Sequence, residues 1–144
     1  MELELKLDDN GIALGDTKED KKQRKQFIKN FYQHWETINQ TKKVFNKSLN
    51  DFINVRFISV DETSGHASHR YMSTLAVIFL TETLEKAKQK GAPKNANPEK
   101  KSQKGFEKII TMEYQKEKFG TIKLTVGVKR GTKEKIQYCL TAIE

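Results

Sequence analysis

Two histidines, His66 and His69, stand three positions apart in the segment "SGHASHRY", immediately before a long apolar run. Imidazole can accept or donate a proton near neutral pH, so the pair is a candidate for general acid and base chemistry. Metal-free cleavage of RNA needs a base for the 2′-hydroxyl proton, an acid for the leaving 5′-oxygen and cations for the phosphorane charge. The sequence supplies all of these residue types, so we consider RNA cleavage first.

Four further residues are candidates for the same site, and one of them is Tyr138, whose face on the strand at 134–143 is left undecided by alternation. Lys123 and Thr125 lie in "TIKLTVGVK", where the alternation of a strand puts both on one face and their apolar neighbours on the other. Arg56 lies in the middle of "FINVRFISV" and would hold a phosphate if it faces the site. Cations that we expect to contact the backbone of a nucleic acid are Arg70, Lys100, Lys101, Lys129 and Arg130.

The two histidines differ in their expected position on a helix. From Ser68 to Lys88 the apolar residues recur at helical spacing, which predicts one long buried helix with His69 in its first turn and His66 before it. A helix N-terminus attracts phosphate, which favours His69 as the reactive residue. The alternative is that both are ordinary polar residues near a helix start. No third ligand stands at a recognisable spacing, so we expect no metal ion and no cofactor.

The elements that must position these residues are helices in the first half and strands in the last third. Residues 16–40 predict an amphipathic helix that Asp16 or Thr17 caps, with Arg24 among the cations of its solvated face. Strands are predicted at residues 2–7, 52–60, 106–115, 120–130 and 134–143. We therefore expect an α+β fold, in which N-terminal helices pack on a mainly antiparallel sheet of about four strands.

Length and charge limit the classes of function. The 144 residues fit one domain, which we divide into an N-terminal helical extension at 1–52 and an α+β core at 53–144 with a mobile basic loop at 88–104. A net charge of +8 favours a nucleic-acid partner, and a merely soluble basic protein is the alternative. Without a glycine-rich phosphate loop or a nucleophile elbow, nucleotide hydrolases and triad hydrolases are excluded.

The cysteine content and the apolar runs indicate the compartment. The single cysteine, Cys139, leaves no internal disulfide, and the longest apolar run is far shorter than a membrane span. The N-terminus has no signal-peptide pattern. We therefore expect a cytoplasmic protein that does not contact a membrane.

Residues 53–144 resemble a known group of nucleases. A helix with an N-terminal histidine, a basic variable loop and the strands "GTIKLTVGVKRGTKEKIQYCLTAIE" follow one another in the order typical of that group. The chain is in this respect similar to the barnase/EndoU/colicin/RelE nuclease-like domains found in polyvalent proteins of phages and mobile elements. The resemblance places His69 or His66 at the helix histidine and Lys123 with Thr125 at the strand motif, whereas no residue matches a catalytic Glu.

The resemblance implies a fold, an activity and partners. The fold would be a helical layer against a four-stranded antiparallel sheet, and the activity metal-independent cleavage of RNA by a toxin or effector. A cognate antitoxin or a host protein would be a second partner beside RNA. Two other functions remain open: a non-catalytic module of a mobile element that binds nucleic acid or protein through residues 88–104, and an inhibitor or immunity protein that ignores nucleic acid.

Overall fold

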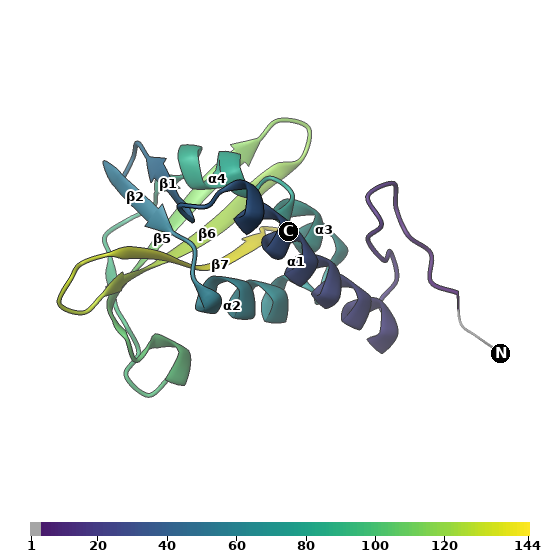
Figure 1. The fold of residues 1–144 in the computed structure, drawn as a ribbon, viewed down its shortest axis with the longest axis horizontal. Helices are drawn as coiled ribbons and strands as arrows, with labels where there is room; N and C mark the ends of the chain where they lie inside the picture. The colour runs from purple at the N-terminus through teal and green to yellow at the C-terminus, as the bar shows by residue number, and fades with distance from the viewer. Residues whose placement is uncertain (1–3) are drawn as a thin grey trace.

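A computed structural model describes residues 4–144, in which four α-helices pack against a seven-stranded sheet (Figure 1). The helices are α1 (Lys18–Ile38), α2 (Phe57–Ala67), α3 (Tyr71–Val77) and α4 (Leu80–Lys86), and a short 3₁₀ helix, η1, spans Lys101–Gln103. The strands are β1 (Lys43–Asn46), β2 (Asp51–Asn54), β3 (Lys88–Gln89), β4 (Lys94–Asn95), β5 (Phe106–Lys116), β6 (Gly120–Lys129) and β7 (Lys135–Ala142). The predicted α+β class is confirmed.

The sheet is larger and more mixed than the four antiparallel strands predicted. Its order is β1-β2-β7-β6-β5-β3, with β4 also paired to β5. The β5–β6–β7 meander is antiparallel, as the sequence predicts, but β2 runs parallel to β7 and pairs with it at only two positions. The added strands come from the hairpin at 43–54 and from very short pairings at 88–95, which are too brief to leave a period in the sequence.

The basic segment at 88–104 is therefore not a loop throughout. β3 and β4 each pair with β5 over two residues, and η1 follows them. At the other end of the chain, the predicted strand at 2–7 is reduced to an isolated bridge between Leu7 and Ala13, and its first two residues lie outside the described part. None of the helices in residues 4–144 combines the length and the apolar character needed to cross a bilayer.

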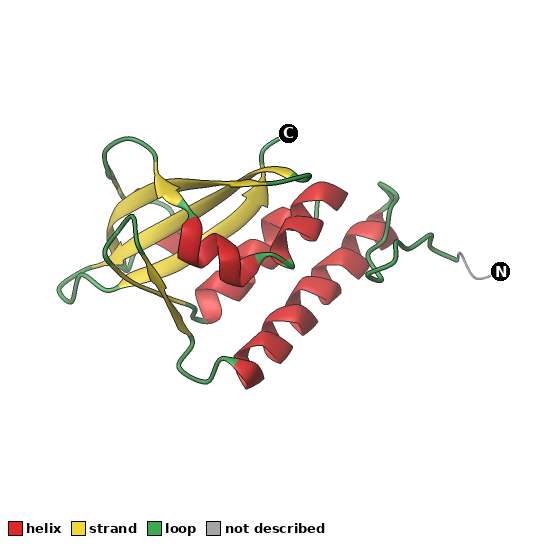
Figure 2. Cartoon of the chain, turned by 90° about the horizontal axis from the view of Figure 1, so that it is seen from above, coloured by secondary structure: helices red, strands yellow, loops and turns green. Residues whose placement is uncertain are grey.

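The helices cover one face of the sheet, with α1 outermost (Figure 2). Side chains of α1, α3 and α4 pack there on Met112, Ile122, Leu124 and Leu140, all of them fully buried. We call the opposite face of the β5–β6–β7 meander the open face. By strand register it carries Thr111, Glu113, Lys123, Thr125, Cys139 and Thr141, so the predicted placement of Lys123 and Thr125 on the non-core side is correct.

Two predicted elements are wrong, and both corrections move candidate residues. The strand predicted at 52–60 ends at Asn54, and Arg56 is the residue that precedes helix α2. Packing against β7 overrides the β-propensity of "FISV", because α2 buries Ser59 and Thr63 on a polar stripe. The helix predicted from Ser68 to Lys88 is broken into α3 and α4 after a turn at 68–70.

The consequence for the histidines is that neither begins a helix. His66 lies in the last turn of α2, and His69 lies in the turn between α2 and α3. This turn is fixed by Arg24 of α1, whose Nε donates to Ser68 O at 2.8 Å and whose Nη2 donates to His69 O at 3.5 Å. The last carbonyl groups of a helix have no hydrogen-bond partner within the helix. Arg24 supplies donors to carbonyl groups at and just after the end of α2.

Arg24 itself is fully buried, although the sequence places it on the solvated face of α1. Besides the turn after α2, its Nη1 donates to Ala13 O at 2.9 Å and to Gly15 O at 2.6 Å. The segment before α1 is thereby tied to the α2–α3 turn. Thr17 caps α1 as predicted, in a capping box with Asp20.

The outer edge of β7 determines where α2 lies. β2 covers only the first residues of this edge, and a hydroxyl group from each of α2 and α3 bonds a peptide group farther along it. Ser59 Oγ donates to Gln137 O at 2.5 Å, and Ala142 N donates to Ser73 Oγ at 3.1 Å. Inside, Gln137 Nε2 donates to the Tyr32 hydroxyl at 2.7 Å. Helix α2 is therefore fixed alongside the strand whose other neighbour is β6.

Replacing Arg24 by methionine should destabilise the fold strongly. The substitution keeps most of the volume but removes a charged donor from buried carbonyls, so we expect a loss of about 3 kcal/mol or more in the free energy of unfolding. Urea denaturation followed by circular dichroism measures it. The exposed Lys25 of the same helix is the matched control, and Lys25→Met should stay within about 0.5 kcal/mol of the wild type. Equal stability of the two variants would contradict the role of Arg24.

Candidate functional site

A bulge in β7 places two consecutive side chains on the open face. Thr125 pairs with Cys139 but Val126 pairs with Gln137, so Tyr138 is an extra residue on β7. The bulge interrupts the alternation of the strand, and Tyr138 and Cys139 therefore both lie on the side away from the helical core while Gln137 points into it. Alternation in the sequence leaves the face of Tyr138 undecided, and the bulge settles it.

Tyr138 takes part in a group of polar side chains at the rim of the open face, which we call the polar cluster: Glu62, His66, Ser102 and Tyr138. The hydroxyls of Ser102 and Tyr138 are 2.5 Å apart, and both lower the pKa of the nearby Glu62 carboxyl. His66 Nε2 lies 3.7 Å from Glu62 Oε2. Because Glu62 and His66 are four residues apart on α2, they share one face of the helix.

The surroundings of Glu62 keep its carboxylate ionised. Burial raises the pKa of Glu62, but the hydroxyls of Tyr138 and Ser102 and the nearby cations of His66 and Lys100 outweigh this effect, so its pKa is lowered from 4.5. Only 15% of the Glu62 side chain is exposed, against 55% of His66. A substrate can therefore reach the imidazole, and the carboxylate behind it is placed to orient the ring.

Cys139 lies between the polar cluster and Lys123. Its thiol contacts Glu62 O at 3.8 Å. Burial, together with the charge of Glu62, raises the pKa of Cys139 to about 11, and Lys123 acts in the opposite direction. The group is therefore a neutral thiol at physiological pH and no nucleophile. Lys123 pairs with Thr141, two residues after Cys139 on β7, so it lies on the same part of the open face as the thiol.

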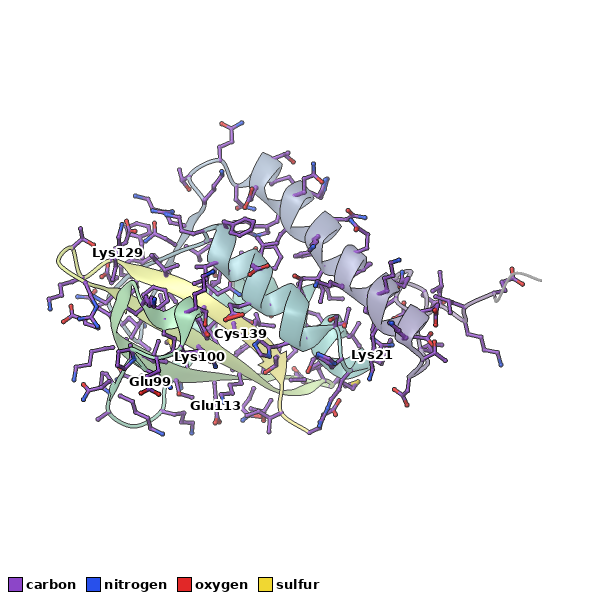
Figure 3. All side chains as sticks on the ribbon, turned by 90° about the horizontal axis from the view of Figure 1, so that it is seen from below. Lys21, Glu99, Lys100, Glu113, Lys129 and Cys139 are labelled. Carbon is purple, nitrogen blue, oxygen red and sulfur yellow. The ribbon has the colours of Figure 1, made fainter. Side chains whose placement is uncertain are left out.

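Two lysines give this region its positive charge. Lys123 is exposed on β6, and Lys100 is the residue directly before η1, the short helix that contains Ser102. Neither has an ion-pair partner within 4.0 Å among residues 4–144. In Figure 3, which views the molecule from this side, Lys100 and Cys139 lie over the same part of the sheet. In the described part of the chain, no three His, Cys, Asp or Glu side chains are grouped to hold a metal ion.

Two of the remaining catalytic candidates from the sequence, Arg56 and His69, lie elsewhere. Arg56 is ten residues before His66, which is about 15 Å along the axis of α2, and its Nη2 contacts Glu134 Oε2 at 3.2 Å. The exposed imidazole of His69 makes no hydrogen bond or ion pair with any residue from 4 to 144, and only its backbone is engaged. Thr125, in contrast, pairs in register with Cys139 and lies close to the polar cluster.

The predicted phosphate-contacting cations are spread over the surface. Arg70 pairs with Glu144 at 2.9 Å, beyond the C-terminal end of α2. Lys129 and Arg130 lie at the β6–β7 hairpin, which Figure 3 shows at one extremity of the molecule. Lys101 is in η1, next to Lys100. The structure thus brings His66, Lys100, Lys101, Lys123 and Thr125 toward one region and leaves the others apart.

Two members of the polar cluster, Glu62 and Ser102, are not among the residues that the sequence singles out, whereas Tyr138 is a candidate whose face alternation leaves undecided. The spacing of Glu62 and His66 is the one signal that could have revealed the pair, and it becomes visible only if residues 57–67 are interpreted as a helix. The bulge at Tyr138 and the position of Ser102 depend on contacts with distant residues. Comparison of the chain with protein-family models, curated proteins and solved structures finds no match.

Replacing Tyr138 by phenylalanine should raise the pKa of Glu62. The hydroxyl stabilises the ionised carboxylate, so its removal favours the protonated form. Titration of the side-chain carboxyl ¹³C signal measures the effect. Tyr114→Phe is the matched control, because the Tyr114 hydroxyl donates to Glu82 at 2.7 Å and its loss should raise the pKa of Glu82 alone. An unchanged pKa of Glu62 in Tyr138→Phe would refute the cluster.

Proposed function

We propose that this chain cleaves RNA at the polar cluster by attack of a 2′-hydroxyl on the adjacent phosphate, without a metal ion. The observation that carries the proposal is the exposed imidazole of His66, held at 3.7 Å from a largely buried, ionised carboxylate. A histidine backed by a carboxylate is a recurrent device for proton transfer. The net charge of +8 and the lysines of the open face favour a polyanionic substrate.

His66 acts as the base in this reaction. Its Nε2 faces Glu62, which leaves Nδ1 to take the proton of the 2′-hydroxyl. The 2′-oxygen then forms a bond to phosphorus, the bond from phosphorus to the 5′-oxygen breaks, and a cyclic phosphate results. Glu62 is a positioning residue that orients the ring and stabilises the imidazolium.

Lys123 and Lys100 stabilise the negative charge that develops on the phosphate oxygens. The ammonium group of Lys123 gives its proton to the leaving 5′-oxygen, and the protons of His66 and Lys123 are re-equilibrated with solvent afterwards. Thr125, on the same face, donates a hydrogen bond to a phosphate oxygen. His69 has no carboxylate partner, and it is given no proton-transfer role.

The biological setting follows from the sequence resemblance to the barnase/EndoU/colicin/RelE domains. On that basis we propose a toxin or effector of a phage or mobile element, with RNA as substrate and a cognate antitoxin or host protein as a second partner. The helical layer behind an antiparallel meander, with charged residues on the opposite face, supports this placement.

His66→Gln should lower kcat/KM for RNA cleavage in EDTA by about 10²- to 10⁴-fold, because it removes the general base. A fluorescently labelled oligoribonucleotide gives the rate. His69→Gln is the matched control and should cleave at nearly the wild-type rate. Glu62→Gln should slow cleavage, because the imidazole loses the carboxylate that orients it.

Two results would contradict this assignment. Cleavage by His66→Gln at the wild-type rate would remove His66 from the reaction. Intact RNA with every protein, together with binding that weakens steeply as salt rises, would instead support a non-catalytic nucleic-acid-binding module.

A further inference from the structure

Phe57, the first residue of α2, is 82% exposed. Phe57 comes soon after β2 and begins α2, whereas His66 lies at the other end of this helix (Figure 1). Phe57 borders two separate cavities, one of about 440 Å³ and one of about 330 Å³. A large aromatic side chain held in solvent between two cavities can stack against a planar ligand on either side.

The larger cavity lies between α2 and η1 and adjoins the polar cluster. It is lined by Phe57, Ile58, Asp61, Lys101 and Ser102, and the hydroxyl of Ser102 is the one that meets Tyr138 in the polar cluster. Glu62 follows Phe57 by five residues, which is about 7.5 Å along the helix axis. The cavity thus has an aromatic wall, polar groups at its edge and the proposed reaction site at its end.

The second cavity lies on the other side of Phe57 and is mainly positive. Its lining includes the cations Lys29, Lys42 and Arg56 and one carboxylate, Glu36. Lys42 contacts Glu36 only at 3.9 Å, and Lys29 has no ion pair with any residue in the described part of the chain. Arg56 contacts Glu134, and both side chains remain at least one-third exposed. An anion such as a phosphate group is the ligand that this set of charges fits.

We propose that the N-terminal end of α2 is a binding subsite for single-stranded RNA. One base stacks on Phe57 in the larger cavity, and a neighbouring phosphate occupies the positive cavity on the other side. A base in a duplex has both faces covered, so this contact requires an unpaired nucleotide. The subsite rests on the proposed function only for its place beside the cleaved bond, whereas the stacking and charge contacts are properties of Phe57 and the two cavities.

RNA fits this end of α2 better than a protein partner does. A protein docking site presents a contiguous apolar patch, but the neighbours of the Phe57 ring in the two cavities include Asp61, Lys101, Lys29 and Arg56. An aromatic ring among cations is instead the arrangement that binds successive bases and phosphates of a single strand.

Binding of an uncleavable RNA tests the subsite apart from the reaction. The probe is a fully 2′-O-methylated, single-stranded octanucleotide, and fluorescence anisotropy gives its dissociation constant. Phe57→Ala should weaken binding about 5- to 100-fold, the range expected for loss of one base–aromatic stack, and Phe57→Trp should restore it. Leu14→Ala, which truncates another exposed apolar side chain outside both cavities, should bind like the wild type.

An abasic octanucleotide separates stacking from a folding defect. Wild type and Phe57→Ala should bind it with equal affinity, because neither can stack a base. The positive cavity is tested with the double variant Lys29→Gln and Arg56→Gln, which should reduce the slope of log affinity against log salt. Lys21→Gln with Lys25→Gln, on α1 and outside the lining of both cavities, makes the same change of charge and should alter the slope less.

The outcomes distinguish this inference from the proposed function. If Phe57→Ala binds the octanucleotide as tightly as the wild type does, the subsite is overturned even if native RNA is cleaved. That result is expected if the ring docks a protein instead. A loss of affinity that persists with the abasic probe would overturn it as well, and so would the absence of RNA binding by the wild type. The expected binding pattern without cleavage of native RNA would establish the subsite and refute the reaction.

Discussion

The outer edge of β7 is the constraint on which the rest of the structure depends. A strand edge exposes peptide groups that need partners, and the parallel pairing with β2 serves only Lys135 and Ile136. Beyond that point the chain turns from β2 into α2, and hydroxyls of the helices take over the edge. A polar stripe on α2 is therefore a requirement of the sheet. The same placement brings the adjoining side of α2, with Glu62 and His66, to the rim of the open face.

Arg24 fixes the end of this helix from behind. Its guanidinium gathers carbonyl groups from the segment before α1 and from the turn after α2, which lie far apart in the sequence. A buried cation is costly unless its donors are satisfied, and here each bonded carbonyl also gains a partner that it lacks locally. The last turn of α2, which carries His66, is thereby held between β7 and α1.

The sequence is informative where local pattern and tertiary structure agree. The meander at 106–143 and the capped start of α1 are predictable because alternation and capping act over a few residues. Residues 52–60 are misleading, since β-branched and aromatic residues occur there on a helix whose buried side is made of Ser59 and Thr63. That error hides the pairing of Glu62 with His66 and gives undue weight to His69. Arg24 is misplaced for a related reason: a charged residue on an amphipathic helix is normally solvated, and only the distant turn explains its burial.

The bulge at Tyr138 makes the side chains on the open face sensitive to the length of β7. Eight residues of β7 lie opposite seven of β6, from Ile122 to Val128. Deleting a single residue there would restore even pairing and leave Leu140 opposite Leu124 in the core, yet the face would lose one of its two adjacent side chains. Insertions and deletions in β7 can therefore remodel this surface while the hydrophobic interior stays intact, a route that point substitutions do not offer.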